Sequence, residues 1–433
     1  MKKILILAVA MLQATLGLAQ PDTLDSRSAH SFQLNGQHWT RGEWRYGALP
    51  SETGEKQARF LMSSTALTLN YKYKGLEMQV TPRHSGIWGA KGGGGFSLDE
   101  GWIALRSRGG LFVKVGRQRL SYDDQRVIGD NDWAMTPSKH DLLRAGFELP
   151  RHKLHLLLAF NQNSENTNGG TYYTDGGQPY KSLQTLWYHV DPFPQLGASL
   201  IFMNTGMQDL MAGEENLVCY QQLFGGFLDF HPGNFSLQAS YYRQTGRDEH
   251  EMAVGAWMTS AEAVWQILPR LRLNTGYFHL SGDEYFFVPP EGALGMARKT
   301  EVHGFNPIFG SHHQFYGAMD FFYVTTYYGG NTPGLQDYHF GIRWKPVERL
   351  SLESEYHCLA TSVRVDDASR LLGHEVELEL SWNMMKDVNL QAGYSFMYGT
   401  PTMELLKRSS DRNRLRWGWL MLLITPEFFS TKF

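Results

Sequence analysis

Long apolar runs are missing from this sequence beyond its first segment, and their absence excludes one class of membrane protein. A membrane-spanning helix needs about 20 consecutive, predominantly apolar residues, and no later stretch of the chain approaches that length. Mean hydropathy is -0.36. We therefore exclude a helical membrane protein. A transmembrane β-barrel is not excluded, because its strands alternate lipid-facing and lumen-facing residues and so keep the average hydropathy low.

Cysteine is also scarce. Only Cys219 and Cys358 occur among 433 residues, and neither belongs to a CxxC pair or to a Cys/His cluster with metal-ligand spacing. One disulfide is arithmetically possible, but Cys358 falls on the apolar face of a predicted strand. We expect two unpaired thiols and no metal site.

Catalytic signatures are equally few. His374-Glu375 lacks the second histidine of a zinc-protease helix. The adjacent histidines His312 and His313 direct their rings apart, which is typical of a solvated loop. No Gly-x-Ser-x-Gly elbow is present. We therefore predict no covalent chemistry and no cofactor, and we expect no nucleic-acid partner.

Residues 1–19 have the form of a cleavable export signal. Two lysines give a positive start, residues 4–12 form an apolar core that is too short to span a membrane, and residues 17–19 are a small-residue cleavage site. We expect the mature chain to have a short N-terminal segment over 20–36 and one barrel domain over 37–433.

From about residue 37 onward, apolar and polar side chains alternate in short segments. Over 76–83 and 338–345 every second residue is apolar and its neighbours are mostly polar or charged, which is the period of a strand with one apolar face. A soluble β-sandwich also alternates. Here, however, aromatic residues lie on the apolar face near segment ends, which is typical of the girdles of an outer-membrane barrel. These aromatic groups are Tyr338 with Trp344, Tyr394 with Phe396 and Tyr398, and Trp417 with Trp419.

The segmentation predicts an all-β, antiparallel, up-and-down barrel of roughly 16 to 18 strands, taking about 10 residues per crossing, and we favour 18. Pro426 cannot donate to a strand ladder, so whether 427–433 continues the last strand is left open. The predicted strands are 37–46, 57–73, 76–88, 98–107, 110–119, 140–149, 152–161, 183–191, 195–204, 218–230, 234–246, 253–267, 271–281, 314–324 or 338–345, 350–360, 373–383, 387–398 and 414–425.

The predicted connections fall into two classes, tight turns and long loops. Short periplasmic turns and long outer loops are the asymmetry of this kind of barrel. The long loops are 120–139, 162–182, 205–217, 282–313 and 399–413. The sequence does not determine whether 282–313 folds into the lumen, where it would set the constriction.

Charged residues concentrate in the segment 111–148, which is predicted to be a strand, a charged loop and a second strand. Its loop carries arginines and aspartates at high density. Inside a pore, low dielectric strengthens ion pairing and makes an unpaired charge costly. We therefore expect a salt-bridge network that lies partly in the pore, with a charged surface loop as the alternative.

Two motifs carry a family resemblance. The first is a Gly-Arg-Gln strand end, an Arg-Val-Ile-Gly...Asp-Trp loop and an Asp-x-x-Arg strand start, and the second is the run 305–317 followed by Met319-Asp320. Together they resemble the alginate export family of outer-membrane barrels, in a form found in Bacteroidetes-type members. The positions of the first motif are Gly116, Arg117, Gln118, Arg126, Val127, Ile128, Gly129, Asp132, Trp133, Asp141 and Arg144.

The resemblance implies a monomeric pore of 18 strands, through which an anionic polysaccharide or another polar solute crosses the outer membrane. Its partners would be outer-membrane lipid and the barrel assembly machinery. In the family, lumen cations attract uronate carboxylates, since guanidinium pairs bidentately with carboxylate and a ring of cations selects anions.

The candidate lumen residues come from the motif and from strand parity. Arg117, Arg126 and Asp132 are the leading candidates, because the motif supplies them. Each cation has an alternative interpretation, a wall arginine neutralised by a nearby carboxylate. The remaining candidates are Arg144, Asp141, Arg41, Arg45, Arg83, Arg343 and Lys345.

We therefore predict an outer-membrane channel for an anionic, alginate-like saccharide, with no enzymatic activity. The alternatives are a general or solute-specific porin, an outer-membrane hydrolase and a structural barrel plugged by its own loops. Overall charge does not favour an anion tunnel: the formal net charge is -3, and it becomes -5 once the two signal lysines are removed. Only the distribution of charge inside the lumen could select anions.

Overall fold

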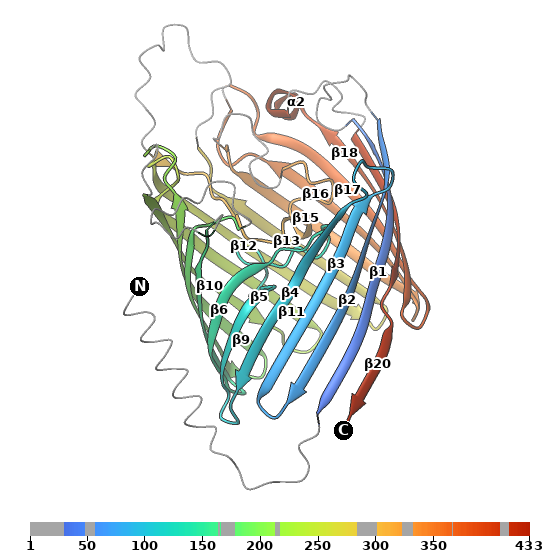
Figure 1. Ribbon diagram of the computed structural model, residues 1–433. Helices are drawn as coiled ribbons and strands as arrows, with labels where there is room; N and C mark the ends of the chain where they lie inside the picture. The colour runs from blue at the N-terminus through green and yellow to red at the C-terminus, as the bar shows by residue number, and fades with distance from the viewer. Residues whose placement is uncertain are drawn as a thin grey trace.

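The structure is a computed structural model of a closed, antiparallel β-barrel (Figure 1). It describes residues 30–47, 57–162, 165, 178–212, 217–283, 301–322, 332–365, 367–407 and 415–433. The predicted export signal lies outside these residues. No helix in the described part of the chain is long and apolar enough to cross a membrane.

The wall has 18 strands, because β19 and β20 together form the last one and the short β14 lies outside the ring. The strands are β1 Ser31–Tyr46, β2 Gln57–Tyr73, β3 Leu76–Ile87, β4 Gly95–Arg106, β5 Leu111–Gln118, β6 His140–Glu148, β7 His152–Phe160, β8 Ser182–Phe193, β9 Leu196–Gln208, β10 Val218–Phe230, β11 Phe235–Arg247, β12 Ala253–Leu268, β13 Leu271–Leu280, β14 Glu301–Val302, β15 Leu335–Val347, β16 Leu350–Ala360, β17 Leu371–Met385, β18 Val388–Gly399, β19 Leu415–Ile424 and β20 Glu427–Lys432. A 3-10 turn, η1 His312–Gln314, and a short helix, α2 Pro401–Lys407, lie in the long loops.

Consecutive wall strands pair antiparallel around the whole ring. β13 pairs with β15, and β1 pairs with β2 on one side and with β19 and β20 on the other, which closes the barrel. Tight turns gather at the end where β20 and the C-terminus lie, and the long loops with α2 lie at the opposite end (Figure 1). A closed ring leaves no sheet edge to be satisfied in lipid.

The seam between the first and last strands contains a break at Pro426. β19 ends at Ile424, and β20 resumes pairing with β1 after a register shift between Leu34 and Asn35. The break follows from the missing N–H of proline. Segment 427–432 therefore does continue the last strand, the point left open by the sequence.

Most predicted strands agree with the structure within a few residues, and three predictions need correction. β1 begins at Ser31, whereas the first strand was predicted from residue 37. Of the two alternatives for the strand after β13, 338–345 lies within β15, and 314–324 is wrong, because its described residues, 314–322, form η1 and irregular loop. The third concerns the aromatic pair of the last strand.

Strand parity separates a lipid face from a lumen face. Tyr338 and Trp344 are about half exposed on the outside, as predicted. Trp417 and Trp419 are 1% and 8% exposed and lie on the lumen side, so their assignment to the outer girdle was wrong. β19 is apolar on both faces, because an inward loop covers its lumen side, and alternation alone could not orient it.

Both cysteines are free, as expected. Cys219 is buried and Cys358 is partly exposed.

Candidate functional site in the barrel lumen

Two long loops fold into the lumen and pack against each other. They are the loop 119–139, which follows β5, and the described segment 303–322 of the β13–β15 connection. A short parallel bridge joins Ile128 to Phe309, and the Gly129 N–H donates to the Phe309 carbonyl at 2.8 Å. The Ser311 N–H donates to the carbonyl of Gln125 at 2.9 Å. We call this pair of loops the plug.

The plug has an apolar interior. Its buried apolar side chains are between 1% and 9% exposed, and they pack with lumen-facing residues of the wall in one cluster. Burial of this kind contributes about 25 cal/mol per Å² of apolar surface, so the loops are held by the same force as a protein core. The buried apolar plug residues are Leu120, Tyr122, Val127, Ile128, Phe305, Phe309, Tyr316, Met319, Phe321 and Phe322.

Polar contacts fasten the plug to opposite walls. On β17, Glu377 accepts the Ala318 N–H at 2.6 Å and Glu375 accepts the Met319 N–H at 2.8 Å. On the far wall, the Trp187 indole of β8 donates to Asp123 at 3.0 Å. These contacts fix the position of the plug relative to β8 and β17.

Arg126, one of the leading candidates, lies inside the plug and not on an open lumen wall. It is 2% exposed, and its guanidinium carbon lies 3.5 Å from the ring centre of Phe278 and 3.8 Å from that of Phe315. Its Nε is 3.2 Å from an Asp124 carboxylate oxygen. Burial raises the pKa of Asp124, and Arg126 opposes that rise. Arg126 thus joins both loops to β13.

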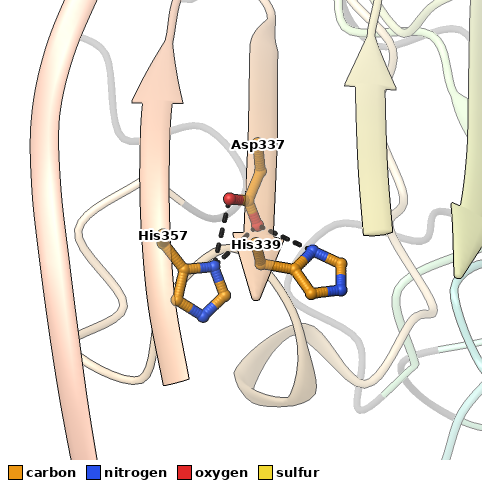
Figure 2. A group of neighbouring side chains, drawn as sticks. All are labelled: Asp337, His339 and His357. Carbon is orange, nitrogen blue, oxygen red and sulfur yellow. Dashed lines mark hydrogen bonds and ion pairs between the residues drawn. The ribbon is translucent and has the colours of Figure 1, made fainter. Parts of the chain in front are cut away.

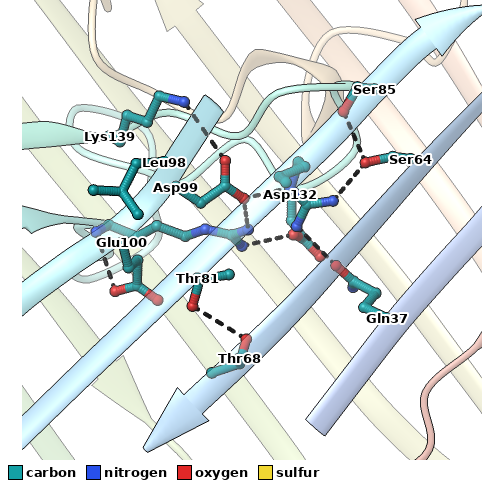
Figure 3. A network of polar contacts seen from close by, with 12 residues as sticks. Gln37, Ser64, Thr68, Thr81, Ser85, Leu98, Asp99, Glu100, Asp132 and Lys139 are labelled. Carbon is teal, nitrogen blue, oxygen red and sulfur yellow. Dashed lines mark hydrogen bonds and ion pairs between the residues drawn. The ribbon is translucent and has the colours of Figure 1, made fainter. Parts of the chain in front are cut away.

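A second cluster surrounds Asp99 on the β3–β4 wall (Figure 3). This fully buried carboxylate pairs with Arg83, with Arg119 at 3.0 Å and with Lys139 at 3.5 Å. Arg119 also pairs with Asp132 at 2.9 Å. The structure brings the predicted residues Arg83 and Asp132 together in one salt-bridge network, in which three cations face two carboxylates.

A third cluster lies on β1. Glu43 pairs with Arg41 at 2.9 Å and with Arg45 at 3.0 Å, as the shared strand face predicted. The Arg41 guanidinium lies 3.9 Å from the ring centre of Trp133 in the plug, and Trp417 donates its indole N–H to Glu43 at 3.0 Å. Both arginines therefore already have a carboxylate partner.

Arg117 and Asp141 do not line the lumen, which differs from the prediction. They lie opposite each other on β5 and β6 and share the parity of Val115, whose side chain is 47% exposed on the lipid face. Their bidentate contact, 2.8 and 2.7 Å, is partly exposed on the outer wall. The Gly-Arg-Gln motif places an arginine at the end of this strand, but the motif does not determine whether that arginine faces the lumen or the lipid. Arg144 does face the lumen, where it contacts Glu148 and His155.

The fourth group lies on β15 to β17 and is mainly acidic. Arg343 contacts Glu353, and Lys345 shares its parity and is exposed near the tight-turn end. Together with the plug, β1, β18 and β19, these strands border a lumen cavity of about 530 Å³. Its charged lining residues are Arg41, Asp132, Arg343, Glu353, Glu355, Glu377 and Glu379, and its aromatic lining residues are Trp39, Trp133, His313 and Trp419.

The cavity contains residues that the sequence analysis had not selected. Glu377 and Glu379 alternate with apolar residues in β17, and Glu353 and Glu355 share one face of the neighbouring β16. The signal in the sequence is the number of acids on one face of two adjacent strands.

Comparisons with known proteins place the fold. No family model and no curated protein matches the chain. Solved structures of outer-membrane porins match over most of the chain: OccAB2 of Acinetobacter baumannii has a TM-score of 0.61 at 12% identity, and the two matched regions cover 92% of this chain and 98% of that one. The chain has the fold of an outer-membrane porin.

Two further porins give the same result. The BenF-like porin of Pseudomonas fluorescens Pf-5 has a TM-score of 0.59 at 13% identity, covering 92% of this chain and 99% of that porin. OccK2 (OpdF) of Pseudomonas aeruginosa, solved in complex with glucuronate, has a TM-score of 0.60 at 13% identity, covering 92% and 98%. This porin-fold barrel lies in the outer membrane. Membership of the alginate export family remains a hypothesis carried by the sequence motifs.

Proposed function

We propose that this porin-fold barrel is a solute-specific, monomeric channel for small polar solutes. The observation that carries the proposal is the lumen cavity of about 530 Å³ that is bordered by the plug, β1 and β15–β19. Binding sites for small molecules have volumes of about 300–1,000 Å³. A plug that fills the upper lumen and leaves a pocket of this size supports passage of one small molecule at a time.

The charge of the cavity supports a preference for solutes with a positive group. Five carboxylates line it, against the guanidinium groups of Arg41 and Arg343 and one histidine. Both guanidinium groups are paired with carboxylates. Asp132 and Glu353 are likewise paired with arginines, so the excess of negative charge rests on Glu355, Glu377 and Glu379. Because low-dielectric walls focus the field of unbalanced charge, the cavity attracts cations and the cationic ends of zwitterions.

Aromatic rings complete the cavity wall. Trp133 stacks on His313 with ring centres 4.4 Å apart and meets Trp419 edge to face at 4.9 Å. The Arg41 guanidinium already lies 3.9 Å from the ring centre of Trp133, so the cation–π contact that such a ring offers, worth about 0.5–2 kcal/mol, is made within the protein. The carboxylates therefore carry the support for an amine-bearing solute, and the rings form the wall beside them.

An anionic saccharide is the second candidate. It is supported by the sequence motifs, by the lumen cations and by the fold shared with OccK2, which was solved with glucuronate. Among the predicted cations that face the lumen, Arg41, Arg45, Arg83 and Arg343 each have a carboxylate partner. Their charge is thereby largely neutralised, and we place this candidate second.

The deciding experiment is the reversal potential of the refolded barrel in a planar bilayer under a salt gradient. We expect cation selectivity, because the cavity carries an excess of carboxylates. Glu379→Gln should weaken that selectivity, whereas Glu348→Gln, in an exposed tight turn, should leave it unchanged. Anion selectivity with block by uronate oligomers would support the saccharide candidate, and the absence of current would contradict any channel.

A further inference from the structure

A buried cluster of metal-binding side chains lies beside the cavity and belongs to none of the networks described above. Asp337 and His339 are two residues apart on the lumen face of β15, and His357 lies directly opposite His339 on β16. Both histidines direct one ring nitrogen at the Asp337 carboxylate, which lies between them (Figure 2). They are 0%, 3% and 5% exposed, respectively.

The donor atoms are close enough for one ion. His357 Nδ1 lies 2.9 and 3.0 Å from the two Asp337 oxygens, and His339 Nδ1 lies 4.0 Å from Asp337 Oδ2. One donor atom from each residue lies within 4.8 Å of the others. In a tetrahedral zinc site with bonds of about 2.0–2.2 Å, neighbouring donors are roughly 3.3 Å apart. Small side-chain rotations would bring all three onto one ion.

The Nδ1 atom of His339 is placed to accept a ligand. It is buried and has no hydrogen-bond partner among the described residues. Leaving a buried polar atom unpaired costs about 1–3 kcal/mol, so such atoms need an explanation. A lone pair on neutral imidazole that faces a carboxylate and a second imidazole is suited to a metal ligand.

The surroundings of the cluster favour a cation and give it a route. Glu377 lies 3.4 Å from the other nitrogen of His357, and Glu355 is the next lumen-facing residue along β16. Both glutamates line the lumen cavity. An ion that enters the cavity therefore meets carboxylates first and the cluster behind them.

We propose that Asp337, His339 and His357 bind a divalent transition-metal ion of the zinc or cobalt type. Two imidazoles and one carboxylate are the mixed N/O donor set that such ions prefer. Three protein ligands leave a fourth position for water.

The site would stabilise the plug as well as the wall. The His339 ring lies 4.4 Å from the ring of Phe278, on which Arg126 of the plug is stacked. An ion that fixes His339 fixes the surface on which the plug rests. Bound metal should therefore raise the heat resistance of the barrel and change the exchange of plug amides.

The test is a Co²⁺ titration of the refolded, chelator-treated full chain in detergent, followed by visible absorption and metal analysis. We expect one ion per chain, with the intense absorption of tetrahedral cobalt, displaced by Zn²⁺. His339→Ala and His357→Ala should each weaken binding by roughly 100-fold or more, since each removes a ligand. His231→Ala is the matched control, because His231 forms a surface pair with Asp229 at 3.6 Å.

Two results would overturn the proposal. One is a wild-type barrel that binds no stoichiometric cobalt at micromolar concentrations. The other is X-ray absorption of the zinc-loaded wild type that shows fewer than two imidazole ligands, a measurement that does not depend on whether the variants fold. Either result would leave Asp337 and His357 as a buried ion pair only. Neither readout depends on transport.

Discussion

The two aspartates Asp99 and Asp141 show how the burial of a carboxylate determines its contribution to folding stability. Asp99 is fully buried among Arg83, Arg119 and Lys139, whereas Asp141 forms a bidentate pair with Arg117 in which its side chain is 40% exposed. Removing one member of a buried ion network leaves uncompensated charge in low dielectric. Removing one member of an exposed pair costs little.

We therefore predict that Asp99→Asn lowers the folding stability of the barrel by about 3–5 kcal/mol. Asp141→Asn should lower it by less than about 1 kcal/mol. Urea-dependent unfolding in lipid vesicles, followed by tryptophan fluorescence, measures both. Equal losses in the two variants would show that burial does not set the cost.

Lys407, at the end of α2, gives a prediction for pH. The residue is 1% exposed, and burial lowers its pKa to about 7. The folded state thus prefers neutral lysine, so this contribution to stability is complete above the unfolded pKa, near 10.5, and is lost as pH falls toward about 7. Below that value it changes no further.

The wild type should accordingly lose up to about 4 kcal/mol between about pH 10 and pH 7 from this residue. Lys407→Met should remove that dependence. The unfolding midpoint across this pH range is the measurement. Lys386→Met, in an exposed tight turn, serves as the control and should keep the wild-type dependence, and a Lys407→Met profile that parallels the wild type would refute the assignment.

The two loops of the plug come into close backbone contact at Gly310. A Cβ on Gly310 would lie 2.4 Å from the carbonyl oxygen of Arg126, so no larger residue fits without separating the two loops. The apolar interior of the plug depends on that closeness, because a gap of this kind forfeits packing on both sides.

Gly310→Ala should therefore loosen the plug and raise single-channel conductance several-fold. Gly95→Ala, where a Cβ would meet nothing within 4 Å, should leave conductance unchanged. Hydrogen exchange of residues 119–139 in the same samples would show whether the loops have separated. An unaltered conductance with faster exchange would mean that the plug does not limit the current.

Strands could be predicted from the sequence because their period is local. Parity placed Arg41, Glu43 and Arg45 on one face and Tyr338 on the other without any knowledge of neighbours. The plug could not be predicted in this way, because its position depends on contacts between segments about 180 residues apart, such as Ser311 with Asn131. Trp417 was misassigned for the same reason: the residues that cover it come from that distant loop.

The candidate site was predicted in part. The motif residues Arg126 and Asp132 do lie in the lumen, and Arg117 does not, because a strand of eight residues such as β5 gives too few apolar positions to orient its charged end. Asp337 was not selected at all. The residues that lie beside Asp337 can be identified only once the register between β15 and β16 is known.

For the barrel as a whole, the plug and the acidic cavity occupy different depths. The plug is formed by loops that leave the wall at the long-loop end. In contrast, Glu353, Glu355 and Gln391 of the cavity lie within a few residues of the tight turns that precede β16 and β18. The carboxylates of β16 thus lie toward the tight-turn mouth of the lumen, and the plug lies toward the long-loop mouth. Ions driven in opposite directions meet these two regions in opposite order.

An ion path with this layout is a rectifier. Cations should accumulate at the plug when the voltage drives them through the acidic mouth first, and they should be depleted there when it drives them the other way, so the current at equal and opposite voltages should differ. Current–voltage curves of single, orientation-checked channels in symmetric salt measure that ratio, which Glu379→Gln should bring closer to one. A wild-type curve that is linear would contradict the expected charge layout. Unequal conduction of this kind requires a voltage across the membrane; without one, the proposed channel would pass a solute equally well in both directions.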